Sequence, residues 1–200
     1  MSLTINILFK RIVMNRTELS EFLSICMPSV KLSAINTAST KIYKAGLISG
    51  GGRGPSIFNI NAKDAANIIL GVLTTSSPVK AADVLRICRE LKGEKAPCCG
   101  LSSENKKSWT IGELLEKLLE NVEACGNLEK LVVCRTEPYA ELHWAKDGKP
   151  ESMIFGKKPI DPLRVDCTLM GFVLHQLSVQ LGGKCRGTID YSTGKKTYFD

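Results

Sequence analysis

The stretch SVKLSAINTASTKIYKAGLISGGGRGPSIFNI, residues 29–60, predicts a helix followed by a basic loop rich in glycine. Winding residues 30–45 at about 100° per residue gathers the apolar side chains on one broad stripe. That stripe comprises Val30, Ala34, Ile35, Ala38, Ile42 and Ala45. The opposite face comprises Leu32, Ser33, Asn36, Ser39, Thr40, Tyr43 and Lys44. Because this second face is polar and almost free of carboxylates, it suits contact with phosphates and base edges.

A shorter helix is predicted just before this one, and Pro28 separates the two. Asn15 and Glu18 have the spacing of a capping box at its start. Its buried side is predicted to comprise Leu19, Phe22, Leu23 and Cys26. We expect Ser29 to cap the second helix and Gly46 to end it in the left-handed conformation. The predicted order is therefore helix, tight turn, helix.

The segment after Gly46 is predicted to be a small β-hairpin. Residues 47–48 and 56–60 have the apolar character of strands, and residues 50–55 form a flexible turn with the cation of Arg53 near its tip. A helix pair followed by such a hairpin has the order of elements of a winged helix-turn-helix domain.

Two further helices are predicted to pack on this unit. Asn61 and Asp64 form a second capping box, which opens a helix over residues 62–73 that is apolar over most of its circumference. Ser77 and Pro78 then have the residue types of a helix start. The inner side of that last helix comprises Ala81, Val84, Leu85, Cys88 and Leu91.

The pattern changes after residue 95. A linker with little periodicity is followed by a capping box at Thr110 and Glu113, which starts a helix that we expect to end near Gly126. Strands are predicted over residues 128–135, 139–145 and 150–155, with a hairpin turn at Asp147 and Gly148. A last helix is predicted over residues 168–181, with Leu169, Phe172, Val173, Leu177 and Leu181 on its inner side.

The chain is therefore predicted to have an α+β fold in several parts. These are an N-terminal arm (1–14), a winged helix-turn-helix domain with extra packing helices (15–95), a linker (96–107), a small domain of helix, β-meander and helix for dimerisation or partner binding (108–183), and a polar tail (184–200). A translation start at Met14 stays open, and it would remove most of the arm.

The basic excess is confined to the first half of the chain. Residues 1–60 hold seven Lys/Arg and two Asp/Glu, a net charge of +5, and residues 61–97 add +2. Residues 98–200 hold fourteen of each sign and are neutral overall. This asymmetry favours an anionic partner for the N-terminal part.

Metal, cofactor and catalytic sites are not predicted. The eight cysteines include no C-x-x-C pair, and His143 and His175 are the sole histidines, so we expect no metal ion. The glycine-rich loop lacks the spacing of nucleotide-binding motifs, so we expect no cofactor. Glu141 and His143 share a strand face, but nothing marks a nucleophile beside them. The sequence therefore favours a protein that is not an enzyme.

The sequence also indicates where in the cell the protein is expected. No apolar run is long enough to cross a bilayer, and the first residues do not have the order of a secretory signal. We expect a cytoplasmic protein with reduced cysteines and no membrane contact.

Several short motifs follow one another between residues 19 and 73: Leu19 with Leu23, Pro28, Ala45-Gly46-Leu47-Ile48, Gly50 to Gly54, and Lys63-Asp64-Ala65-Ala66-Asn67. Their order resembles a group of uncharacterised helix-turn-helix proteins found in bacterial prophages. The resemblance covers a quarter to a third of the chain and implies a winged-helix-like, DNA-binding protein of phage or mobile-element origin. The predicted recognition helix is poorer in arginine than is usual for this type.

We therefore expect a DNA-binding protein that regulates transcription and binds double-stranded DNA as a homodimer. The predicted contacts are Ser29, Lys31, Ser33, Asn36, Thr40, Lys41, Tyr43, Lys44 and Arg53. A protein partner could bind through residues 108–183. The alternative is a protein-interaction or phage assembly adaptor in which the helix-turn-helix serves as a scaffold.

Overall fold

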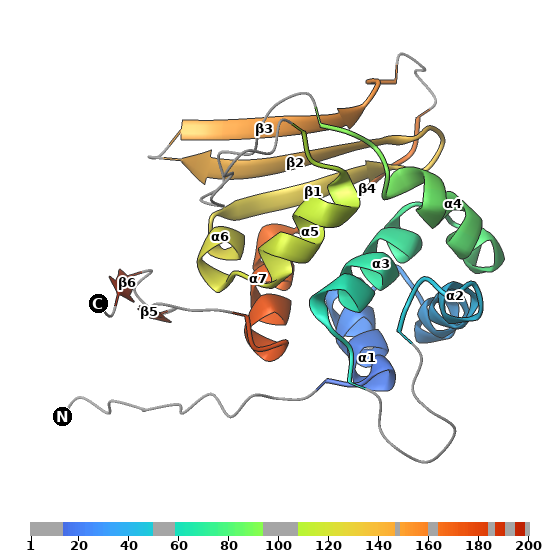
Figure 1. Cartoon of the computed structure of the whole chain (residues 1–200), viewed down its shortest axis with the longest axis horizontal. Coiled ribbons are helices and arrows are strands. Elements are labelled where there is room, and N and C mark those ends of the chain that lie inside the picture. Colours follow the sequence, from blue (N-terminus) through green and yellow to red (C-terminus); the bar gives the residue numbers. More distant parts are fainter. Residues whose placement is uncertain are drawn as a thin grey trace.

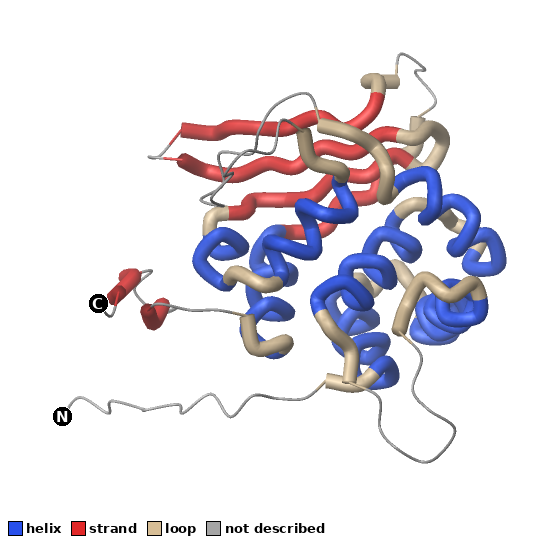
Figure 2. Tube along the Cα trace, in the orientation of Figure 1, coloured by secondary structure: helices blue, strands red, loops and turns tan. Residues whose placement is uncertain are grey.

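The computed structural model describes residues 14–49, 59–93, 108–146, 149–159, 164–183, 187–190 and 195–198. An antiparallel sheet lies at one side of the molecule, and helices pack against one of its faces (Figures 1 and 2). The mixed α+β class predicted from the sequence is confirmed.

The helices are α1 (Arg16–Cys26), α2 (Leu32–Lys44), α3 (Ala62–Leu73), α4 (Ala81–Cys88), α5 (Ile111–Leu119), α6 (Val122–Gly126) and α7 (Gly171–Gln180), with a short 3₁₀ helix, η1 (Pro78–Lys80), before α4. The strands are β1 (Leu128–Cys134), β2 (Tyr139–Lys146), β3 (Lys149–Gly156), β4 (Asp166–Met170), β5 (Gly187–Asp190) and β6 (Lys195–Tyr198). The first four strands form one antiparallel sheet in the order β3-β2-β1-β4, and β5 pairs with β6.

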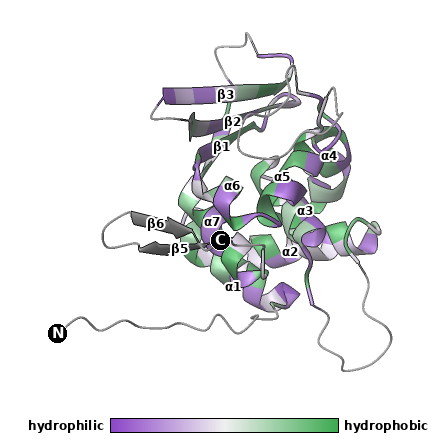
Figure 3. Ribbon diagram, turned by 60° about the vertical axis from the view of Figure 1, so that its left-hand side comes forward, coloured by the Kyte–Doolittle hydropathy of each residue, from purple (hydrophilic) through white to green (hydrophobic). Residues whose placement is uncertain are grey.

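The two faces of the sheet differ in character. Leu131 of β1 lies beside Leu142 of β2 and Leu169 of β4, and all three side chains are buried on the face toward the helices. The neighbouring residue pair, Lys130 and His143, is on the other face because side chains alternate along a strand. Figure 3 shows β3 changing from hydrophilic at its start to hydrophobic at its end.

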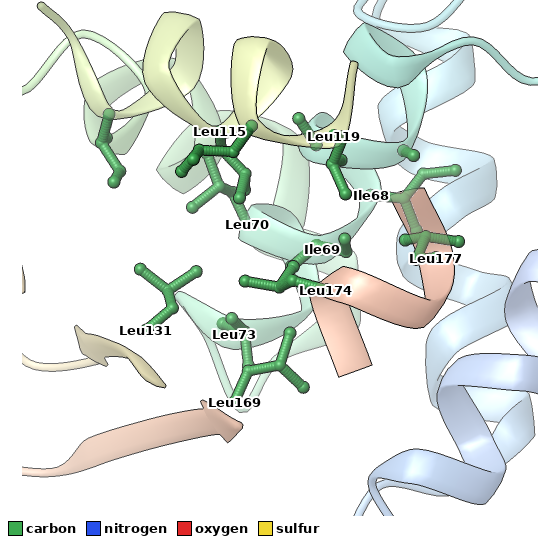
Figure 4. Close-up of a cluster of buried hydrophobic side chains, with 14 of the residues drawn as sticks. Ile68, Ile69, Leu70, Leu73, Leu115, Leu119, Leu131, Leu169, Leu174 and Leu177 are labelled. Atoms are coloured by element: carbon green, nitrogen blue, oxygen red, sulfur yellow. The ribbon is translucent and has the colours of Figure 1, made fainter. Parts of the chain in front are cut away.

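Helix α3 lies at the centre of the core. It packs against α2, α4 and α5, and every residue in it except Lys63 is buried. Figure 4 shows its side chains among those of α5, α7 and the sheet: Ile68, Ile69, Leu70 and Leu73 meet Leu115, Leu119, Leu131, Leu169, Leu174 and Leu177. Burial of each such side chain contributes roughly 1.5–3 kcal/mol. The buried side chains form one cluster from Met14 to Leu177, so both predicted domains contribute to the same core.

Several local predictions are confirmed. Asn15 and Glu18 form the expected capping box on α1, and Thr110 and Glu113 form the one on α5. Gly46 has a φ of 70°, as expected for the left-handed residue after α2. These signals depend on residues within one turn of each other, which explains why they can be recognised in the sequence.

The starts of two helices differ from the prediction. Ser29 does not cap α2; the helix begins after Lys31, without a side-chain cap, because a turn closed by the Val30 amide and the Met27 carbonyl intervenes. Ser77 likewise makes no side-chain capping bond, and the chain passes through η1 before α4.

The predicted helix from Thr110 to Gly126 is two helices. The side chain of Asn121 accepts a hydrogen bond from the amide of Ala124 and so starts α6 after a break at Glu120. An asparagine inside a predicted helix is thus a second N-cap.

The predicted last helix is also wrong at its start. Residues 166–170 form β4, which pairs with β1, and α7 begins at Gly171. Phe172, which was expected to face inward, is 60% exposed, whereas Val173 and Leu177 are buried as expected. Long-range pairing with β1 decides the conformation of this segment.

Burial sets the chemistry of the cysteines. Cys88 and Cys125 are buried in the helical core, and Cys26 and Cys167 are half-buried. Burial raises the pKa of the Cys88 thiol to about 12, so this side chain stays protonated and packs as a small apolar group. Among the residues that the structure describes, no helix combines the length and the apolar character needed to cross a membrane.

Candidate functional site

The solvent-facing side of α2, which we call the α2 face, carries most of the predicted contact residues. Lys31, Ser33, Asn36, Thr37, Lys41, Tyr43 and Lys44 are exposed along it, and Ser29 is exposed just before the helix. Ile35, Ala38 and Ile42 are buried on the opposite side, as predicted. The sequence therefore separated the two sides of this helix correctly for most positions.

Two residues expected on the polar side of α2 are not part of the α2 face: Ser39 and the predicted contact Thr40. Ser39 is buried, with 1% of its surface exposed. The helices packed around α2 cover a wider part of the α2 surface than the apolar stripe alone. Thr40 is half-buried. Arg53 and the predicted turn over residues 50–55 lie outside the described residues.

The described flanks of that turn do not form the predicted hairpin. Residues 47–49 are not in a strand, and Asn59 forms an isolated antiparallel bridge with Asn15. The amide of Ser49 instead donates to Oδ1 of Asp64 at 2.8 Å. Asp64 is therefore bonded to Ser49 and does not complete the predicted capping box, although Asn61 caps α3 as expected.

The C-terminal end of α2 is held by hydrogen bonds from α3 and α4. Arg86 donates to the carbonyl of Ala45 at 3.4 Å, and Nδ2 of Asn67 donates to the carbonyl of Leu47. Arg89 donates in turn to Oδ1 of Asn67 at 3.1 Å. These bonds fix α2 on the rest of the core, so its exposed face is presented in one orientation.

The α2 face is positively charged. Residues 22–63 contain no Asp or Glu. In the described part of the chain, Lys31, Lys41 and Lys44 form no ion pair, and Asp83 on neighbouring α4 is paired with Arg86 at 3.6 Å. The α2 face thus combines unpaired surface cations with hydroxyl and amide groups.

Helix α1 adds a cation that sequence reasoning missed. The guanidinium of Arg16 lies over the ring of Tyr43, 5.3 Å from its centre. Arg16 belongs to a different helix, so no periodicity in α2 could indicate it. The contact orients Tyr43 and extends the positive charge from α2 onto α1.

A second polar group lies on the face of the sheet away from the helices. Glu141 accepts a hydrogen bond from the hydroxyl of Tyr139, its Oε2 lies 2.8 Å from Nε2 of His143, and Lys158 is 3.9 Å from its other oxygen. Burial would raise the pKa of Glu141, but the hydrogen bonds from Tyr139 and His143 outweigh it and the pKa is lowered. Burial and the nearby carboxylate raise the pKa of Tyr139.

This group has the geometry of a charged hydrogen-bond network. His143 and Glu141 were correctly predicted to share a face, but none of the described hydroxyl or thiol groups is hydrogen-bonded to His143. Across the described ranges, no group of three or more His, Cys, Asp or Glu side chains is placed to hold a metal ion.

Comparisons with models of known protein families, with curated proteins and with solved structures gave no match.

The Glu141 network predicts a specific pH dependence of stability. Folding lowers the pKa of Glu141 from its ordinary value of 4.5. The ionised Glu141 therefore stabilises the folded state fully above pH 4.5, and this stabilisation is lost as the pH falls through the pKa of the folded protein. We expect Glu141→Gln to reduce the free energy of unfolding by about 1–2 kcal/mol at neutral pH. Urea denaturation at a series of acid pH values should show that the free energies of unfolding of the variant and of the unchanged protein converge below the ordinary glutamate pKa. Glu129→Gln removes an exposed carboxylate from the same sheet and should show no such trend; a constant difference for Glu141→Gln would refute the assignment.

Proposed function

We propose that this protein binds duplex DNA through the α2 face, as the second helix of a helix-turn-helix, with Arg53 making a further contact. The observation that carries the proposal is the composition of the exposed side of α2. Lys31, Lys41 and Lys44 form no ion pair in the described part of the chain, and they lie in a segment without carboxylates, residues 22–63. A face of this kind attracts the phosphate backbone and is poorly suited to a basic or apolar partner.

The dimensions and groups of α2 support contact with the major groove. Its 13 residues correspond to a length of about 20 Å, and an α-helix fits a groove about 12 Å wide. Asn36 lies on the exposed side, where its amide could pair with an adenine edge. Ser33 and Thr37 offer hydroxyl groups, and Lys41 and Lys44 offer cations for phosphates.

The biological role rests on the sequence resemblance. A regulator of transcription from a phage or mobile element would combine such a DNA-binding unit with a region for dimerisation. Residues 108–183 are the proposed dimerisation or partner region, and they contain the four-stranded sheet.

Neutralising two proposed phosphate contacts tests the function. We expect Lys44→Gln with Arg53→Gln to weaken binding to any duplex on the order of tenfold, and to lower the slope of log affinity against log salt by about two. Fluorescence anisotropy with a labelled duplex at several salt concentrations measures both quantities.

The matched control removes the same charge elsewhere. Lys149→Gln with Lys157→Gln changes two exposed lysines at the two ends of β3, far from α2 (Figure 1). This double variant should bind DNA as the unchanged protein does. Equal affinity and equal salt slope for both double variants would argue against DNA binding through α2. A nuclease-resistant complex with another protein would then favour the scaffold function.

A further inference from the structure

A cavity of about 320 Å³ lies behind the first turns of α2. Its walls are formed by the start of α2, the end of α3 and the segment that leads into η1. The apolar part of the lining comprises Val30, Ala34, Ala38, Val72 and Pro78. This volume is at the lower end of the range of small-molecule sites, which is about 300–1,000 Å³.

Arg135 contributes a cation to this apolar cavity. It follows β1, so it comes from the opposite half of the chain, and its side chain is half-buried. Its Nε donates to the carbonyl of Leu73 at 3.0 Å, and Nη2 lies 3.5 Å from the sulfur of Cys167. These two bonds hold the guanidinium in place and use two of its five N–H donors.

The charge of Arg135 is not neutralised within the part of the chain that the structure describes. No carboxylate there forms an ion pair with it. Lys31 and Ser29 also line the cavity, and both are exposed. A fixed, half-buried guanidinium at an apolar wall favours an anionic group that can accept two parallel hydrogen bonds.

The cation of Arg135 and the apolar walls together define the kind of ligand that the cavity fits. We propose that the cavity binds a small organic carboxylate, whose anionic end pairs with Arg135 and whose apolar body packs against Ala34, Val30 and Val72. Inorganic phosphate, or a phosphate of DNA, would satisfy the cation but leave the apolar walls uncovered. The cavity adjoins the α2 face at Lys31, and binding of the carboxylate does not depend on whether the protein binds DNA.

A direct binding experiment on the full chain tests the proposal. Octanoate, 4-phenylbutyrate and benzoate are titrated by isothermal calorimetry and by NMR. Two control probes are titrated in the same way: octan-1-ol, which has an apolar body but no anionic group, and inorganic phosphate, which is anionic but has no apolar body. We expect at least one carboxylate to bind with a Kd on the order of 1 mM or lower. We expect octan-1-ol and phosphate to bind about tenfold more weakly or not at all.

Two variants locate the site. Arg135→Met keeps the length of the side chain and should weaken carboxylate binding about tenfold or more, whereas Arg135→Lys should retain part of it. Ala34→Leu fills the cavity from the half-buried side of α2 and should abolish binding even if Arg135→Met fails to fold. The proposal is overturned if no carboxylate binds, if phosphate binds as tightly, or if binding survives in Ala34→Leu.

Discussion

Replacing Gly171 with alanine is expected to lower the free energy of unfolding by about 3 kcal/mol or more. Gly171 is the first residue of α7 and follows β4 directly. A Cβ atom there would overlap the backbone carbonyl of Leu128 and would also lie 3.0 Å from the carbonyl carbon of Glu129. These are backbone atoms at the start of β1, so relief of the overlap requires a shift of α7 or of the sheet.

Urea denaturation followed by far-UV circular dichroism measures this effect. Gly46→Ala provides the matched control, because Gly46 has a positive φ but an added Cβ would meet no atom within 4 Å. That substitution should cost about 1 kcal/mol from backbone strain alone. Equal stabilities for Gly171→Ala and the unchanged protein would show that α7 does not sit this close to β1.

Leu70→Ala is expected to have the second largest effect, a loss of about 2–5 kcal/mol. Leu70 is fully buried in α3, the helix that packs against α2 and α4 of the N-terminal part and against α5 of the C-terminal part. Because one buried cluster joins both parts, we expect the destabilisation to reach the sheet as well.

Two probes followed in one urea titration can test this coupling. Fluorescence reports on Trp109 and Trp144, which both belong to the C-terminal part, and circular dichroism reports on all helices. We expect the two curves to shift together for Leu70→Ala and to stay unchanged for Ile87→Ala, since Ile87 is 58% exposed. If Leu70→Ala leaves the urea midpoint of the fluorescence transition unchanged, the result would instead support two independently stable domains divided at residues 96–107.

The sequence predicted those features that depend on near neighbours. The Thr110 capping box and the alternation of Leu142 with Glu141 and His143 are local patterns, and both are present in the structure. The predicted last helix starts too early because Leu169, Phe172 and Val173 also fit a helical spacing. Pairing with β1 decides their conformation, and no local pattern contains that partner.

In the candidate sites, too, local sequence patterns do not reveal the residues that tertiary packing brings together. The polar side of α2 could be recognised from periodicity, yet Ser39 on that side is buried by helices that the pattern does not include. Arg16 reaches Tyr43 from α1, and Arg135 reaches the cavity behind α2 from beyond β1. Both cations are brought to α2 by tertiary packing, so one stretch of sequence could not reveal them.

The central claim, that the α2 face contacts DNA, is tested most directly by NMR on the isotope-labelled full chain. A short duplex is titrated at low salt, and the amide signals that move are mapped onto the structure. We predict that the largest shifts occur between Ser33 and Lys44, with a smaller change at Arg16. Shifts confined to the sheet face away from the helices, around Lys130 and His143, or no shifts at all, would contradict the account.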